Sequence, residues 1–153
     1  MSNFKCQRGV ALVELALTIG ILITIVFGIT EFGRAIYQYD TLAKAARDAA
    51  RYLSTKAPGD ATAIGDAQCY AVHGNPSCTG SVLAPGLTTA MVSVCDAVSC
   101  PATHQAQGAA PVVNLVSVTI GGANNPYPFN SLVEFVVPSF NFGAISVTMR
   151  QVL

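Results

Sequence analysis

One acidic residue, Glu14, lies inside a long apolar run that extends from Arg8 to Thr30. Moving an ionised side chain to the centre of a bilayer costs about 2.5–3.5 kcal/mol on insertion scales, and acids within membrane segments are by default functional and paired. Gly9 precedes Glu14 in the pattern G-x-x-x-x-E, where a short basic leader meets the apolar run. The residue types therefore predict charge pairing, and Glu14 needs a partner.

Residues that could perform catalysis are sparse in the rest of the chain. No serine stands in a Gly-x-Ser-x-Gly elbow, and cysteines engaged in disulfides are not available as nucleophiles. Eight basic residues balance eight acidic ones, and only 10% of the chain is charged. No basic patch points to nucleic acid. We therefore expect neither an enzyme nor a nucleic-acid-binding protein. The acids after residue 57 are Asp60, Asp66, Asp96 and Glu134.

The leader and the apolar run predict a membrane topology. Residues 1–9 carry Lys5 and Arg8 and no acid, so the positive-inside rule places them in the cytoplasm. A helix of about 20 residues spans a hydrocarbon core of about 30 Å, which residues 10–30 can do. A cleaved secretory signal fits poorly, because no small-x-small site follows the run and an acid lies inside it. We expect one membrane crossing, with the rest of the chain on the far side.

The junction from Gly9 to Glu14 resembles the processing site of type IV prepilins. The resemblance implies that a prepilin peptidase cuts after Gly9 on the cytoplasmic side and leaves Val10 as the new amino terminus. Glu14 would then lie one helical turn from a free α-amine, and its carboxylate would neutralise the amine of a neighbouring subunit during filament assembly. This role matches the need for a partner, since the charge stays desolvated unless assembly occurs.

The likeness continues from Arg8 to Tyr52, a segment that resembles the TadE-like family of the tight-adherence (Tad, or Flp) pilus. Shared features are the Arg-Gly leader end, the acid at Glu14, the Glu31-x-Gly33-Arg34 step and the repeat Ala-Ala-Arg-x-Ala-Ala-Arg that ends at Arg51. Leu15 stands where the major pilins of this system usually have tyrosine, and those pilins contain little beyond the helix. The resemblance therefore implies a minor pilin or pseudopilin that takes part in assembling an adhesive pilus.

This resemblance also implies partners and a location. The partners would be a prepilin peptidase, other pilin or pseudopilin subunits, the inner-membrane assembly platform and the membrane itself. The chain would cross the bacterial inner membrane once, with its amino terminus cytoplasmic and its C-terminal domain periplasmic, and would become extracellular if it enters the pilus. The alternative is a membrane-anchored extracellular binding domain or adhesin that does not assemble into filaments.

Four segments are expected: a prepilin leader (1–9), a membrane and assembly helix (10–30), a helix continuation (31–57) and an exposed α+β domain (58–153). Apolar or small residues recur at three- and four-residue spacing after residue 31, which predicts one helix from Val10 to Ser54. Glu31 and Arg34 are expected to pair at the membrane surface and are candidates for subunit contact. A shorter helix, capped by Asp60, should reach Val72. Alternating patterns predict a small antiparallel sheet with strands at Met91–Asp96, Leu115–Gly121, Leu132–Val137 and Ala144–Val152.

The cysteines test the compartment independently. There are five, but the cut implied after Gly9 would discard Cys6 and leave an even set, which in an oxidising compartment indicates two disulfides. Three connectivities are possible, and we favour the pairs Cys69 with Cys78 and Cys95 with Cys100 because each closes a short loop. A zinc site that adds His73 and His104 is the rival, but the spacings lack the usual C-x-x-C. We expect no metal and no cofactor, with both histidines in solvated loops.

Overall fold

The computed structural model describes residues 7–105 and 113–152, and for residues 7 and 8 it describes the backbone alone. The leader residues Lys5 and Cys6, on which the expected orientation and cysteine count depend, lie outside the described residues. The Arg8 side chain, the other leader charge, also lies outside them.

The chain divides into two compact units. The first comprises Met1–Ile36 and Asn130–Ser139, and the second comprises Tyr37–Phe129 and Phe140–Leu153. This division differs from the expected segments in two respects. Residues 37–53 of the long helix belong to the folded domain, and the ten residues Asn130–Ser139 belong with the N-terminal part of the helix.

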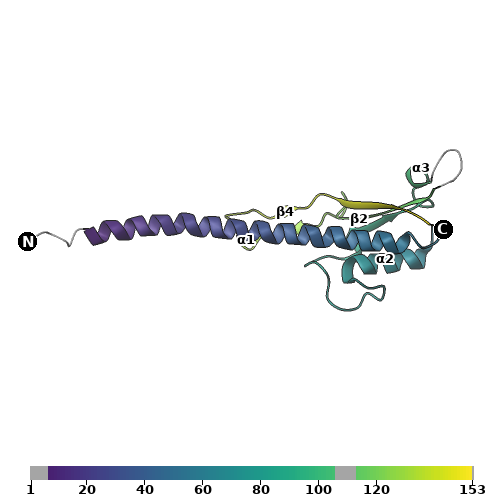
Figure 1. The fold of residues 1–153 in the computed structure, drawn as a ribbon, viewed down its shortest axis with the longest axis horizontal. Helices are drawn as coiled ribbons and strands as arrows, with labels where there is room; N and C mark the ends of the chain where they lie inside the picture. Colours follow the sequence, from purple (N-terminus) through teal and green to yellow (C-terminus); the bar gives the residue numbers. More distant parts are fainter. Residues whose placement is uncertain (1–6, 106–112, 153) are drawn as a thin grey trace, which may run out of the picture. The chain divides into compact units, whose positions relative to one another are not determined.

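Helix α1 spans Gln7–Leu53, which confirms the long helix predicted from Val10 to Ser54 (Figure 1). Because the helix begins before Val10, Gly9 lies within it. No proline occurs between its ends, so nothing removes a backbone hydrogen bond along its length. By length and composition, α1 is able to cross a membrane, which is consistent with single-pass anchoring.

The third predicted strand, Leu132–Val137, is wrong. These residues form a turn of helical type, in which the carbonyl of Val133 accepts the N–H groups of Val136 at 3.0 Å and Val137 at 3.1 Å. Two short strands flank the turn instead: β3 (Pro128–Phe129) pairs antiparallel with β4 (Phe140–Asn141). A short apolar run does not by itself distinguish a buried strand from other structure, because its periodicity carries too little information.

The second unit contains the main sheet, in which β1 (Val92–Cys95), β2 (Leu115–Ile120) and β5 (Ile145–Arg150) lie in the order β1-β2-β5. Both pairings are antiparallel, with Val118 opposite Val94 on one side and Val147 on the other. The prediction of a small antiparallel sheet is therefore confirmed with three strands. Alternation along β2 buries Val116, Val118 and Ile120 and directs Ser117 and Thr119 to the other face.

Helix α2 (Ala61–His73) confirms the predicted second helix. The Asp60 carboxylate caps its first turn by accepting the N–H groups of Thr62 at 2.9 Å and Ala63 at 3.2 Å. Gly74 ends it with a φ of 74°, a left-handed conformation that glycine adopts without steric cost. Two further short elements are the 3₁₀ turn η1 (Thr89–Met91) and helix α3 (Pro101–His104).

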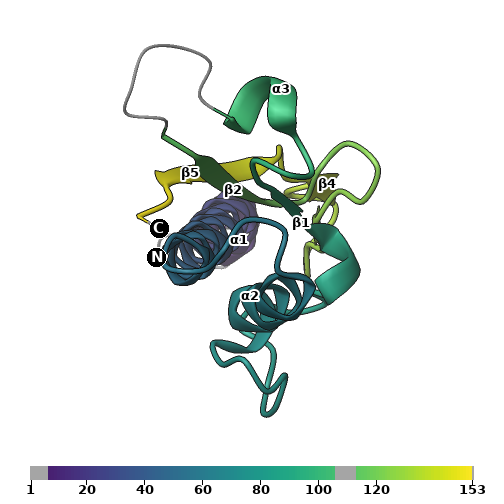
Figure 2. The ribbon, with the colours of Figure 1, turned by 90° about the vertical axis from the view of Figure 1, so that its right-hand side faces the viewer.

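An alanine-rich interface holds the helices of the second unit together. Within this unit, α1 and α2 lie on one side of the sheet and α3 on the other (Figure 2). The small side chains let the two helices approach closely, while Leu42 and the apolar face of β2 fill the space between helix and sheet. The tilted rings of Tyr52 and Tyr70 and a 2.9 Å hydrogen bond from the Tyr52 hydroxyl to Asp66 close the edge of this interface. The fully buried alanines are Ala46, Ala49, Ala50, Ala67 and Ala71.

Candidate functional site

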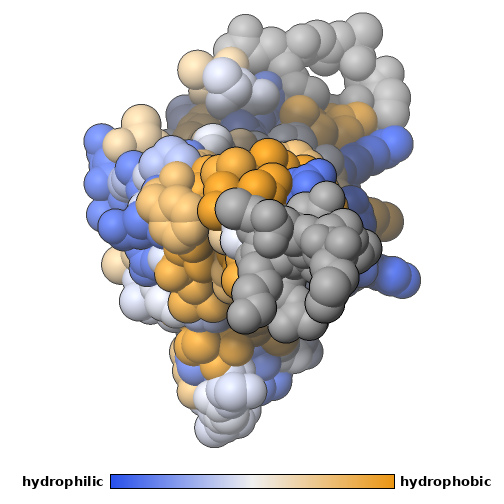
Figure 3. Space-filling model, turned by 90° about the vertical axis from the view of Figure 1, so that its left-hand side faces the viewer, coloured by the Kyte–Doolittle hydropathy of each residue, from blue (hydrophilic) through white to orange (hydrophobic). Residues whose placement is uncertain are grey.

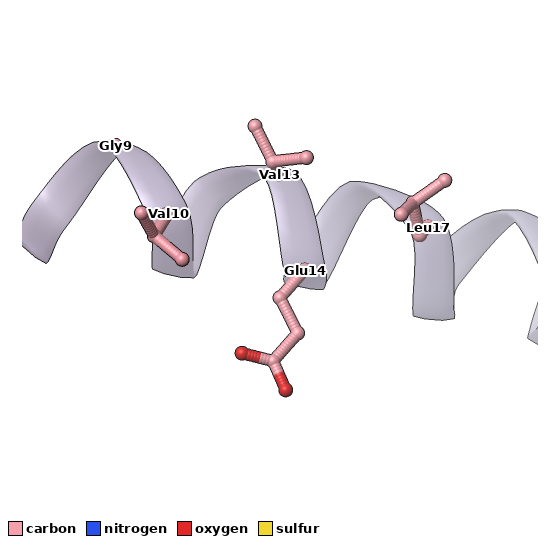
Figure 4. Close-up of a pocket in the computed structure, with 5 residues that line it drawn as sticks. All are labelled: Gly9, Val10, Val13, Glu14 and Leu17. Carbon is pink, nitrogen blue, oxygen red and sulfur yellow. The ribbon is translucent and has the colours of Figure 1, made fainter.

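The predicted processing and assembly residues, Gly9, Val10 and Glu14, lie on the first turns of α1 and are all exposed. Figure 4 shows the Glu14 side chain extended away from the helix, with its carboxylate at the outer end. Val10 lies one turn before it, on the same helical face. A Cβ added at Gly9 would meet no atom within 4 Å, so the packing of the described residues does not require glycine there.

The surface around Glu14 is apolar for several turns. Between Gly9 and Thr30, Glu14 is the one charged residue, and every position but Gly28 is exposed. The hydroxyls of Thr18, Thr24 and Thr30 donate to backbone carbonyls of the same helix, so they bring no unpaired donor to this surface. Figure 3, which views the left-hand end of Figure 1, shows apolar side chains at the surface. The exposed large side chains of this segment include Leu12, Leu17, Ile21, Leu22, Phe27 and Ile29.

The second candidate pair, Glu31 and Arg34, is joined as the sequence predicts. Arg34 Nη1 donates to both carboxylate oxygens of Glu31 at 2.8 Å. The carboxylate also accepts the Ser131 hydroxyl at 3.2 Å and the backbone N–H of Leu132 at 3.3 Å. Glu31 is only 2% exposed, and a buried carboxylate is stable when such donors surround it.

These contacts assign Glu31 a task that sequence reasoning missed. Its carboxylate holds the turn after Asn130 against α1, and Arg34 Nη2 adds a bond to the Asn130 carbonyl at 3.4 Å. The partners of Glu31 follow it by 100 and 101 positions, and no spacing rule links residues so far apart. The carboxylate is therefore engaged within its own chain, and its expected contact with another subunit stays a prediction.

The structure joins Cys69 to Cys78 and Cys95 to Cys100, the two local pairs that the sequence favoured. Their Cα atoms lie 4.7 Å and 5.6 Å apart, within the usual range for disulfides. The first bridge connects α2 to the loop that follows it, and the second connects the end of β1 to the start of α3. Both therefore fasten short loops to regular elements.

The cluster that most resembles a metal site consists of Cys95, Cys100 and His104, whose candidate ligand atoms lie within 4.8 Å of one another. The two sulfurs are bonded to each other, so neither is a thiolate ligand. His104 Nε2 lies 2.8 Å from the Ser117 hydroxyl, and Nδ1 lies 2.7 Å from Thr103 Oγ1. His104 ends α3 and His73 ends α2, which corrects their expected place in loops.

Asp96 is the most fully bonded carboxylate of the second unit. It accepts the N–H groups of Gly59 at 2.7 Å, Val98 at 3.1 Å and Ser99 at 2.8 Å, and the Ser99 hydroxyl at 2.8 Å. Burial alone would raise the pKa of Asp96, but these hydrogen bonds outweigh burial and hold the pKa below its usual value. Gly59 lies in the connection between α1 and α2, and Asp96 directly follows β1. The hydrogen bond between them therefore fixes this connection to the end of β1.

Comparison with family models finds a match along α1. Residues 9–51 match the family model described as TadE-like protein, which confirms the resemblance over that segment. The matched segment begins at Gly9, includes Glu14, Glu31 and Arg34, and covers less than a third of the chain. No curated protein and no solved structure matches the chain. The family likeness therefore concerns α1, and the rest of the folded domain lies outside the matched segment.

Proposed function

We propose that this chain is a minor pilin or pseudopilin that takes part in assembling a Tad-type pilus for adhesion. The carrying observation is Glu14, an exposed carboxylate on an apolar helical surface with no partner among the described side chains. Its position five residues after Gly9 resembles that of the prepilin motif, and the TadE-like match begins at this glycine. The same proposal includes the more general statement that the chain associates with pilus components and with the membrane.

The physical chemistry of α1 supports this role. A carboxylate on a lipid-facing helix is costly until a cation pairs with it. A cut after Gly9 would create such a cation, the Val10 amine, at the end of each subunit's helix. When helices pack side by side with a one-turn stagger, the amine of one subunit meets Glu14 of its neighbour. Assembly then becomes more favourable than staying alone, because two uncompensated charges neutralise each other.

We further propose that the role of the protein is structural and not catalytic. The Cys–His cluster of the described residues has its sulfurs joined in a disulfide. The buried acids Glu31 and Asp96 are engaged by donors of their own chain. The proposed partners are therefore proteins and lipid: a prepilin peptidase, other pilin subunits and the inner-membrane platform. The proposed orientation places the N-terminus in the cytoplasm and the folded domain in the periplasm.

The sharpest test is the amino terminus of the mature protein. We expect chemical sequencing or intact-mass analysis of membrane-extracted protein to find Val10 as the first residue. The variant Gly9→Leu should stay uncut, because the helix accepts a side chain there without a clash and only peptidase recognition is lost. Gly20→Leu is the matched control, since it also meets no atom within 4 Å but lies outside the motif, and it should be cut normally. A mature protein that begins at Met1, or beyond residue 30, would refute the proposal.

A further inference from the structure

The segment Asn130–Ser139 presents two large apolar side chains to solvent. Leu132 is 76% exposed and Phe135 is 80% exposed. They are three residues apart, and Leu132 directly precedes the turn in which the Val133 carbonyl accepts the N–H groups of Val136 and Val137. The described contacts of the turn leave these two side chains outside any protein core. Two exposed apolar side chains of this size, only three residues apart in the chain, mark a candidate interaction surface.

Other atoms of the same segment fix it to α1. A Cβ built on Gly28 would lie 3.6 Å from Cγ1 of Val136. The Glu31 carboxylate binds Ser131 and Leu132, and Arg34 binds the Asn130 carbonyl. These attachments all fall between residues 28 and 34 of the helix. The turn is therefore held at one level along α1, where the apolar run ends and the first charged pair follows.

That level is the boundary of the expected membrane segment, residues 10–30. The α1 surface at the same height is itself apolar and exposed, with Phe27, Ile29 and Phe32 among its side chains. Leu132 and Phe135 thus extend the lipid-facing surface of the helix sideways. Aromatic and apolar side chains at this depth favour the region between headgroups and acyl chains.

We propose that the turn 130–139 is an interfacial membrane anchor that inserts Leu132 and Phe135 into the lipid beside the end of the membrane helix. The occupant is lipid because the segment is attached to α1 at the end of the apolar surface that must face lipid once α1 crosses the membrane. The segment has Glu134 and no lysine or arginine, so apolar burial drives the contact and attraction to anionic headgroups does not. The proposal rests on membrane crossing by α1 and is independent of pilus assembly.

The chain lacks tryptophan, so one substitution gives a site-specific reporter. Phe135→Trp in the full chain is reconstituted into phosphatidylcholine vesicles at high lipid-to-protein ratio. We expect blue-shifted emission and strong quenching by lipid brominated near the headgroup, with weaker quenching by lipid brominated near the chain end. Adding anionic lipid or salt should leave the quenching unchanged.

Two matched reporters keep the outcome interpretable. Leu22→Trp, in the middle of the apolar run, should be quenched best by deep bromines, which verifies that α1 crosses the bilayer. Val98→Trp, an exposed position of the second unit, should emit as in water and stay unquenched. If the Phe135→Trp reporter behaves like the Val98→Trp reporter while the Leu22→Trp reporter is quenched, the anchor proposal is overturned. A blue shift without bromine quenching that grows with protein density overturns it as well, because a second copy would then cover the patch.

Discussion

Two stretches of α1, residues 9–30 and residues 37–53, differ in how much of their surface is buried. In the first, all positions but Gly28 are exposed. In the second, Leu42, Leu53 and four alanines are buried against α2 and the sheet. Residues 37–53 therefore make their contacts within the chain, whereas residues 9–30 expose an apolar surface and an acid that has no partner among the described side chains. Continuity of a helix therefore says nothing about where its contacts come from.

The two acids Glu14 and Glu31 of α1 also differ in whether their own chain supplies hydrogen-bond donors. Glu31 has a full set of donors from its own chain, and Glu14 has no partner among the described side chains. The first carboxylate holds the segment after Asn130 against α1, and under the proposed function the second pairs with a neighbouring subunit. This difference predicts that substitutions at the two positions separate structure from function.

The largest effect is expected from Glu14→Leu. The substitution removes the charge that would pair with a neighbour, so we expect loss of pilus assembly, while membrane insertion persists or improves. The measurement compares sheared filaments, seen by electron microscopy, with the amount of protein in the membrane fraction. Glu31→Leu is the contrasting variant: it removes the oxygen that accepts the Leu132 N–H, so it should raise the amide hydrogen exchange of Leu132 from protected to loop-like. Normal piliation with Glu14→Leu would favour the membrane-anchored binding domain over the pilin.

The next largest effect is expected on the unfolding free energy, which substitutions in the two stretches should change by different amounts. Leu42→Ala opens a cavity between α1 and the sheet and should lower the unfolding free energy of the folded domain by about 2–5 kcal/mol. Leu17→Ala is the matched change on the exposed stretch, and it should leave the unfolding midpoint unchanged. Chemical denaturation in detergent, followed by circular dichroism, measures both. Equal losses for the two variants would show that residues 9–30 have a partner within the chain.

The disulfides sharpen the picture of the second unit as a self-contained fold. Opening either loop by serine substitution of both cysteines should cost about 2–3 kcal/mol by the loop-closure estimate, with the longer Cys69–Cys78 loop at the upper end. Thermal melts before and after reduction would measure the loss. Membrane insertion should be unaffected, because α1 carries neither bridge. A melt that reduction leaves unchanged would contradict this expectation.

The smallest effect concerns pH. The hydrogen-bonded Asp96 has a pKa below its usual value in the folded state, so folding favours its ionised form. Its contribution to stability is therefore present above the unfolded pKa of about 3.9 and is lost as the pH falls through the folded pKa. Asp96→Asn should lower stability at neutral pH and flatten the acid limb of a stability–pH curve. An unchanged acid limb would show that other groups dominate it.

The sequence by itself determined the elements whose signal is local. Three- and four-residue periodicity predicts α1, the Asp60 cap predicts the start of α2, and alternation predicts β1, β2 and β5. Short loops between cysteines favour the two pairings that the structure shows. Glu14 could be identified for the same reason, because a charged residue within an apolar run is a local feature of the sequence.

Only the tertiary structure decided which distant segments meet. Where the sequence predicts a strand, the structure has a turn. Hydrogen bonds from Ser131 and Leu132 to Glu31, about one hundred positions away, hold this turn against the helix. The short apolar run Leu132–Val137 does not indicate which remote residues its backbone contacts. Hydrogen bonds and packing between remote segments depend on how the chain closes on itself, and no spacing within either segment carries that information.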